Sequence, residues 1–203
     1  MTVISVFNQK GGSGKTMLSV HLAVAAHMAG RKVAILDLDP QGSASHWRNA
    51  RGETAEPVVV KVPDGSLERA VAGAKADGFD FILIDAPPTV TAATARIIGA
   101  ADLVVIPIRP EPFDLAAIPD TIKLVGTQRY VFVLSDCPPR APEIEEAREA
   151  LLKLGRPVFG PINNWRSMWR SLIAGQAVSE YEPDGKPAEE IQAVCDSILK
   201  EIS

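Results

Sequence analysis

The sequence predicts an α/β protein with a doubly wound, mostly parallel sheet flanked by helices on both faces. Apolar runs alternate with segments of helical period from one end of the chain to the other. Several runs, such as "FILI" and "LVVIPI", are apolar at consecutive positions, as expected for strands that are covered on both faces. The 203 residues show no repeat or linker, so we expect a single domain over residues 1–203.

The expected elements follow the chain in alternating order. The expected strands are Val3–Phe7, Lys32–Leu38, Val58–Val62, Phe79–Asp85, Leu103–Pro107, Tyr130–Leu134 and, with a weaker signal, Pro157–Gly160. The expected helices are Lys15–Ala29, Ser66–Ala76, Thr91–Gly99, Leu115–Val125, Pro142–Leu154 and Ala188–Ile202. In this fold class, ligands bind at the carboxyl ends of the strands.

The composition is ordinary for a soluble globular protein, with 46% apolar and 23% charged residues, and we expect a cytoplasmic protein. The opening "MTVISVFNQKGG" has no basic segment followed by an apolar run, so we expect no signal peptide. The apolar runs are strand-length and too short to span a membrane. Cys137 and Cys195 lack metal-ligand spacing, and we expect both to be reduced and buried.

Charge is unevenly distributed along a chain whose net charge is −4. Residues 150–179 contain no acidic residue and carry four cations, whereas residues 180–203 carry seven acidic residues and two lysines. The four cations are Lys153, Arg156, Arg166 and Arg170. Such asymmetry can produce a basic patch that the net charge conceals.

The segment "FNQKGGSGKT" between the first strand and the first helix predicts a phosphate loop. Its glycines allow successive backbone N–H groups to turn toward phosphate oxygens, and the helix that opens at Lys15 adds the positive end of its dipole. The usual motif, G-x-x-x-x-G-K-[ST], has glycine where this chain has Gln9. The expected nucleotide contacts in the loop are Lys10, Gly11, Gly12, Ser13, Gly14, Lys15, Thr16 and Met17.

Acidic residues at two strand ends support a magnesium–nucleotide site. Lys15 is expected to bridge the β- and γ-phosphates, and the Thr16 hydroxyl to bind Mg²⁺. "AILDLDPQGS" supplies Asp37 and Asp39, and "FILIDAPP" supplies Asp85 as the natural Walker-B acid. An aspartate at a strand end is often only a turn or helix cap, but three beside a phosphate loop favour metal or water binding.

These motifs together resemble those of one ATPase family. "KGGSGKT" with its extra Lys10 matches the deviant Walker A motif of ParA/MinD-type ATPases, and "DLDPQGS" matches that family's second motif. "ILIDAPP" followed by "ADLVVIPIRPEPFDL" is similar to its Walker B and switch region. The resemblance is densest over residues 1–115, and the short chain looks most like the small, ParF-like ParA group.

The resemblance implies a function for Lys10 as well as for Lys15. In this family two ATP-bound subunits form a homodimer, and the extra lysine reaches the phosphates held by the partner, as an arginine finger does. Asp39 matches the position that orients the attacking water, with Asp37 supporting the metal site. Pro110–Asp114 is expected near the active site. The alternative for Lys10 is a solvated loop lysine.

Two departures from the family pattern affect the nucleotide site. Met17 stands where the family usually has a second threonine, so a hydroxyl near the α-phosphate is missing. The segment "VLSDCPPR" stands where the family often has asparagine near the base. Ser135, Asp136 or the backbone of Pro138 and Pro139 is therefore expected to line the base pocket, with Pro138 as a cofactor contact. ATP/ADP and Mg²⁺ are the expected cofactors, and base selectivity stays open.

The resemblance also implies nonspecific DNA binding by the ATP-bound dimer on the nucleoid. The segment "NNWRSMWRSL" places Arg166 and Arg170 four residues apart, on one face if helical, with Trp165 and Trp169 beside them. Alternatively, both tryptophans belong to the core and the arginines are a solvated rim. Such proteins segregate plasmid DNA or position a protein cargo, and a ParB-type protein or cargo adaptor stimulates hydrolysis.

Two other function classes fit the sequence less well. A MinD-like ATPase that cycles on membranes requires a terminal amphipathic helix with a basic face. The tail "PAEEIQAVCDSILKEIS" is acidic, and Ile191, Val194, Ile198 and Ile202 are expected to pack on the sheet, so no membrane partner is expected. An enzyme like the nitrogenase iron protein requires a cysteine pair that bridges a cluster, which Cys137 and Cys195 do not offer.

Overall fold

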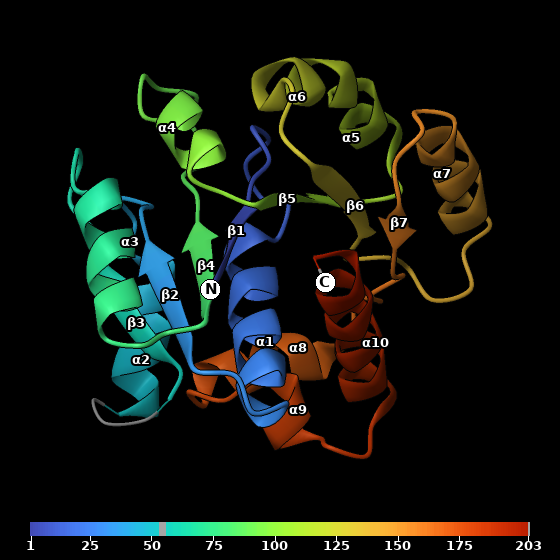
Figure 1. Ribbon diagram of the computed structural model, residues 1–203. Helices are drawn as coiled ribbons and strands as arrows, with labels where there is room; N and C mark the ends of the chain where they lie inside the picture. Colours follow the sequence, from blue (N-terminus) through green and yellow to red (C-terminus); the bar gives the residue numbers. More distant parts are fainter. Residues whose placement is uncertain (53–55, 203) are drawn as a thin grey trace.

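The computed structural model describes residues 1–52 and 56–202, and it is built around one parallel sheet. The seven strands of the described residues lie in the order β3-β2-β4-β1-β5-β6-β7 (Figure 1). Every neighbouring pair is parallel. The doubly wound α/β fold is therefore confirmed.

The elements alternate along the chain as the sequence predicts, with some additional helices. The strands are β1 (Thr2–Val6), β2 (Val33–Asp37), β3 (Val58–Lys61), β4 (Phe81–Asp85), β5 (Leu103–Ile108), β6 (Tyr130–Leu134) and β7 (Val158–Phe159). The helices are α1 (Lys15–Met28), α2 (Ser43–Arg51), α3 (Leu67–Ala76), α4 (Thr94–Gly99), α5 (Pro112–Ala116), α6 (Ile118–Val125), α7 (Glu143–Leu152), α8 (Arg166–Ile173), α9 (Val178–Tyr181) and α10 (Lys186–Glu201).

The sheet separates two hydrophobic cores, which explains its continuous apolar runs. In β4, Phe81 and Leu83 belong to one core, whereas Ile82 and Ile84 belong to the other. The first core is covered by α1, α2, α8, α9 and α10, and the second by α3, α4, α6 and α7. In Figure 1 the sheet crosses the middle of the molecule, with α1, α8, α9 and α10 below it and α4, α6 and α7 above it.

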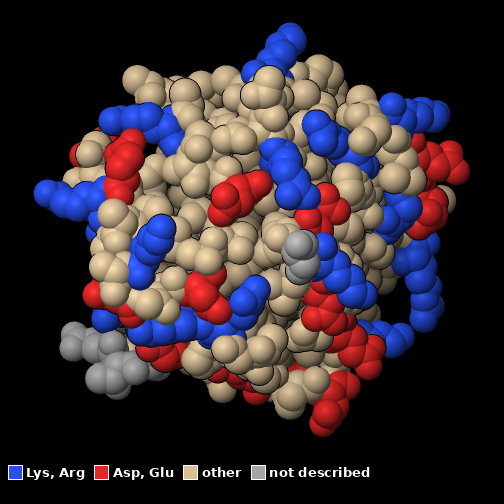
Figure 2. Space-filling model, viewed as in Figure 1, with Lys and Arg blue, Asp and Glu red and all other residues tan. Residues whose placement is uncertain are grey.

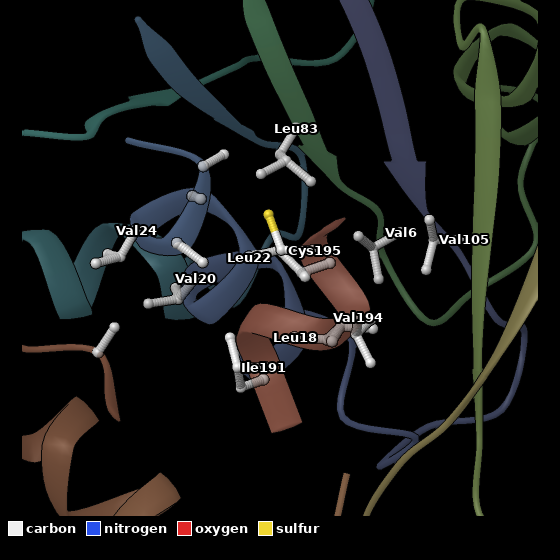
Figure 3. Close-up of a cluster of buried hydrophobic side chains, with 14 of the residues drawn as sticks. Val6, Leu18, Val20, Leu22, Val24, Leu83, Val105, Ile191, Val194 and Cys195 are labelled. Atoms are coloured by element: carbon white, nitrogen blue, oxygen red, sulfur yellow. The ribbon is translucent and has the colours of Figure 1, made fainter. Parts of the chain in front are cut away.

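The carboxyl-terminal helix α10 is part of the first core. Ile191, Val194 and Ile198 are at most 1% exposed, and α10 packs beside α1 against the sheet (Figure 3). This confirms the predicted packing of the tail. Cys137 and Cys195 are free and buried, as expected, and burial raises the pKa of each thiol to about 12. Among the described residues, no helix has the length and apolar character needed to cross a membrane.

Several elements differ from the predicted ones, and α8 and α9, like α2, were not among the expected helices. The expected helix over 115–125 is two helices, α5 and α6, because Pro119 lies in the first turn of α6 and has no N–H to continue the hydrogen bonding of α5. The helix α2 was not predicted. Only Ala44 and Trp47 are buried in it, so its sequence gives a weak helical apolar pattern.

Candidate active site

The predicted site residues converge because three strands end in register. Val6 of β1 and Asp37 of β2 are both paired with Asp85 of β4. The phosphate loop leaves β1 between the ends of β4 and β5. The two aspartates and the loop therefore lie at the same edge of the sheet, where ligands of doubly wound folds bind.

The backbone of the loop is shaped for an anion. Gly12 and Gly14 have φ of 74° and 81°, values that residues with a Cβ rarely adopt. Gly14 is the N-cap of α1, and neither a capping side chain nor an acidic residue occupies the first turn. The first N–H groups of α1 are thus left for a ligand with negative charge.

Lys15 is a buried cation inside the loop. The residue is 7% exposed, and its Nζ donates to the Lys10 carbonyl at 3.3 Å. Burial lowers the pKa of Lys15, while the nearby charges of Asp85 and Asp39 raise it. Lys15 forms no salt bridge with a described residue, so a phosphate group is well suited to compensate its charge.

Asp85 has the features of a magnesium-site carboxylate. Its Oδ1 accepts a hydrogen bond from the Ser19 hydroxyl at 3.3 Å, whereas its buried Oδ2 has no partner. Burial raises the pKa of Asp85 to about 7, and the hydroxyls of Thr16 and Ser19 oppose this rise. A divalent cation would satisfy the orphan oxygen and restore the ionised form.

The residues present suit a phosphate-bound magnesium ion rather than a metal held by protein alone. Within residues 1–52 and 56–202, no group of three or more His, Cys, Asp and Glu side chains is arranged to hold a metal ion. Mg²⁺ is typically held by one or two protein oxygens together with substrate phosphates and water. Thr16 and Asp85 provide that small donor set beside the loop.

Lys10 is held by its own chain in this structure. Its Nζ forms an ion pair with Asp114, whose side chain is fully buried. Asp114 also accepts from Arg109, at 3.2 Å from Nη2 to Oδ1 and 3.3 Å from Nε to Oδ2. The Lys10 N–H is fixed by the Asn8 Oδ1 at 2.9 Å. Lys10 is therefore not a freely solvated loop lysine, and Asp114 lies beside the loop.

Asp37 anchors the loop that carries Asp39. Its Oδ2 accepts from the Ser45 N–H at 3.0 Å and the Ser45 hydroxyl at 2.6 Å, and its Oδ1 accepts from the Asp39 N–H at 3.2 Å. Lys61 of β3 contacts the Asp37 carboxylate at 3.5 Å and the Asp39 carbonyl. These contacts differ from those of a metal ligand, so the predicted metal role of Asp37 stays a prediction. No pattern in the sequence had indicated Lys61.

A cavity of about 600 Å³ joins the loop to α2 and α8. It is lined by Gly12, Ser13, Gly14, Lys15, Thr16, Met17, Val20, Asp39, Ser43, His46, Trp47, Ala50, Pro88, Asp136, Trp169, Leu172 and Ile173. Asp136 thus lies at the cavity, as the sequence suggested, whereas Pro138 is exposed and does not line it. The predicted base contact of Pro138 stays a prediction.

The arginines predicted to contact DNA lie on α8. Arg166 and Arg170 are exposed and form no salt bridge with a described residue. Trp165 is half-buried, and its Nε1 donates to the Glu190 Oε2 at 2.9 Å, whereas Trp169 is 56% exposed. Trp165 is therefore part of the packed structure, whereas the exposed ring of Trp169 is accessible to another molecule. On the face shown in Figure 2, basic and acidic side chains are interspersed.

Comparison with known proteins identifies the family. The model of the CobQ/CobB/MinD/ParA nucleotide-binding domain matches residues 4–178. The chain belongs to this family. It is similar to the "Maintenance of carboxysome distribution protein A" of Gloeobacter kilaueensis, with 32% identity over 98% of this chain and 93% of the relative. The protein of the same name from Halothiobacillus neapolitanus is 28% identical over 97% of this chain and 95% of its own.

Solved structures share the fold at lower identity. The apo McdA of Cyanothece has a TM-score of 0.77 and 19% identity, covering 98% of this chain and 99% of its own. MinD of Pyrococcus horikoshii in complex with Mg-ADP has a TM-score of 0.75 and 19% identity. The match covers 97% of this chain and 95% of the MinD chain. These similarities support the ParA/MinD-type fold that the motifs predicted.

Proposed function

We propose that this chain is a magnesium-dependent ATPase that dimerises around ATP, binds DNA nonspecifically in that state and positions a cargo on the nucleoid. The observation that carries the proposal is the phosphate loop with two lysines, of which only Lys15 points into its own loop. Lys10 lies at the outer side of the loop, beside Asp114. A second lysine outside its own nucleotide site is consistent with a lysine that completes the nucleotide site of another subunit.

In the proposed hydrolysis, different residues bind the phosphates, orient the attacking water and compensate the charge of the phosphate groups. Lys15 and the loop N–H groups bind the β- and γ-phosphates, and Thr16 and Asp85 hold Mg²⁺. When bound, Mg²⁺ neutralises charge on the phosphate oxygens. Asp39 accepts a hydrogen bond from the attacking water and orients it toward the γ-phosphate. Lys10 leaves Asp114 and compensates charge on the partner's nucleotide during transfer.

The cargo that we propose is a protein assembly rather than a plasmid. The two carboxysome-distribution relatives match over 97–98% of this chain, whereas "Protein ParA" of Rhizobium radiobacter matches over 85% and Soj of Thermus thermophilus over 57%. A partner protein from the cargo would stimulate slow intrinsic hydrolysis. The test is ATP turnover with and without the product of a neighbouring gene, in the presence of DNA.

DNA binding is tested by a mobility assay with ATP and with ADP. We expect ATP-dependent binding that falls as salt rises, because the contacts are to phosphates. The variant R166A/R170A should bind several-fold more weakly. The control R69A/K75A removes two exposed cations from α3, outside residues 150–179, and it should bind normally.

The second candidate function is that of a MinD-like ATPase on membranes. Cosedimentation with anionic liposomes, run beside the DNA assay, distinguishes the two. ATP-dependent lipid binding without DNA binding would reject our proposal. We expect the reverse, because the apolar face of α10 is already buried in the first core.

A further inference from the structure

Three large apolar side chains are exposed near the phosphate loop without an assigned role. Phe113 of α5 is 82% exposed, Ile173 of α8 is 81% exposed and Trp169 of α8 is 56% exposed. Phe113 precedes Asp114, the residue that holds Lys10. Exposed apolar groups gathered around a functional site are typical of a surface that another molecule covers.

The two α8 residues border an apolar extension of the candidate active site. We call this extension the α2–α8 pocket, and it is lined by Val20, His46, Trp47, Ala50, Leu172 and Ile173. Trp169 and Met17 line the same cavity, which also includes the phosphate loop. Because the cavity is continuous, a nucleotide in the loop would lie beside any group that enters the pocket.

Phe113 and the α2 residues of the α2–α8 pocket lie on opposite sides of the phosphate loop. Phe113 follows β5, which neighbours β1 on one side, whereas α2 follows β2, which lies beyond β4 on the other side. They also belong to different layers: α5 packs with α6 above the sheet, and α2 and α8 cover the lower face (Figure 1). The loop with Lys10 is thus between a projecting ring and an apolar recess.

We propose that Phe113 of each subunit enters the α2–α8 pocket of a second copy of this chain, next to Ile173 and Trp169. This inference rests on the proposed ATP-dependent dimer. A twofold interface is self-complementary, so a feature on one side of its axis meets the feature on the opposite side of the other subunit. With a twofold axis near Lys10, the Phe113 ring of each subunit meets the α2–α8 pocket of the other. Each dimer therefore contains the contact twice.

The arrangement favours a second copy over other occupants. A DNA backbone requires cations where it docks, whereas most of the side chains that line the pocket are apolar. A membrane requires apolar groups on one common surface, whereas Phe113 and Ile173 are separated by the loop and belong to different layers. The contact would also lie next to the nucleotide site, because Phe113 is adjacent in sequence to Asp114, the residue that pairs with Lys10.

The experiment uses complementary charges placed on separate subunits. F113K and I173E are each expected to weaken dimerisation at least tenfold, measured by sedimentation velocity with a non-hydrolysable ATP analogue. Both positions are more than 80% exposed, so the variants should fold. Binding of a fluorescent ATP analogue to monomeric F113K should be unchanged, because Phe113 does not line the nucleotide cavity. The control is L152K, at a residue of α7 that is 51% exposed, and it should dimerise normally.

Mixing the two variants tests the pairing itself. The mixed dimer brings the introduced ammonium to the introduced carboxylate in one contact and keeps native Phe113 with native Ile173 in the other. We therefore expect the mixture to dimerise where each variant alone does not. A disulfide between F113C of one subunit and I173C of another should form only with the ATP analogue, since the native cysteines are buried.

The outcomes distinguish this inference from the proposed function. If the wild-type chain stays monomeric with the ATP analogue, the proposed function fails. If the wild type dimerises and both charged variants dimerise equally well, or if the mixture is not restored, the Phe113 contact is wrong. A loss confined to liposome binding or to stimulation by a partner protein, with dimerisation intact, would assign the pocket to that occupant and overturn the inference.

Discussion

The two lysines of the phosphate loop are five positions apart and have opposite environments. Lys15 is 7% exposed and is held by the backbone of its own loop. The Lys10 side chain is 28% exposed and is paired with Asp114 at the rim. Lys15 is thus already positioned for a phosphate, whereas Lys10 would have to leave Asp114 before it could act as proposed. Under the proposed function, this difference separates a preformed binding site from a hydrolytic site that requires a second subunit.

Replacing Lys15 should have the largest effect. K15A removes the buried cation that faces the phosphates, and we expect ATP affinity to fall by about 100-fold or more. Isothermal titration with ATP and Mg²⁺ measures this. K75A, which removes an exposed lysine of α3, should bind normally. Near-normal affinity of K15A would show that the loop does not hold the nucleotide as described.

Replacing Lys10 should separate binding from assembly. K10A should keep ATP affinity within several-fold of wild type, but it should lose the ATP-dependent dimer and at least about 100-fold in turnover. Sedimentation velocity and phosphate release measure the two effects. Normal dimerisation and turnover of K10A would remove the proposed role of this lysine in the partner's site.

Replacing Asp39 should greatly reduce turnover but preserve the ATP-dependent dimer. D39A removes the group proposed to orient water and leaves the phosphate contacts in place, so turnover should fall about 100-fold while the ATP dimer persists. The dimer should also outlast that of the wild type after excess ADP is added. Rapid dissociation of D39A would indicate that Asp39 holds the dimer rather than the water.

Acidity should weaken the magnesium site about tenfold. The pKa of Asp85 is raised to about 7 by burial, so the group is increasingly protonated below that pH, and only the carboxylate attracts Mg²⁺. With ADP saturating, Mg²⁺ affinity at pH 6 should be about tenfold lower than at pH 8. D85N should bind Mg²⁺ weakly and without this pH dependence. An unchanged pH profile in D85N would assign the titration to another group.

Weakening the ion pair between Lys10 and Asp114 should have the smallest effect. D114N keeps the shape of the side chain but weakens its hold on Lys10, so the dimer should form at protein concentrations lower by a few-fold. The control is D120N, which removes a surface pair with Lys123. A D114N dimer that is weaker than wild type would show that Asp114 supports the assembled state instead.

The sequence predicted the parts of this architecture that depend on local pattern. Buried parallel strands such as β4 give continuous apolar runs, and the glycine spacing before Lys15 reflects backbone angles that few other residues adopt. The magnesium-site candidates Thr16 and Asp85 were found because motif and strand end coincide. These signals lie within short segments and do not depend on the tertiary arrangement.

The contacts that escaped prediction join segments distant in sequence. Lys10 and Asp114 are 104 residues apart, and Lys61 and Asp37 are 24 apart. The family resemblance placed Pro110–Asp114 near the active site, but neither pair of partners was predicted, because the pairing arises only when β5 lies beside β1 and β3 beside β2. The helix α2 was missed for a related reason, since its two buried residues meet partners that only the fold supplies.

Arg109 provides a second cation for the buried carboxylate of Asp114. A buried carboxylate that loses its only cation is costly, typically by 3–5 kcal/mol. Asp114 keeps two hydrogen bonds from Arg109 when Lys10 departs, so its charge stays compensated. The movement of Lys10 that we propose would therefore leave the fold intact and be readily reversed. A protein built in this way would release and recapture its lysine through many rounds of nucleotide turnover, as a repeating timer requires.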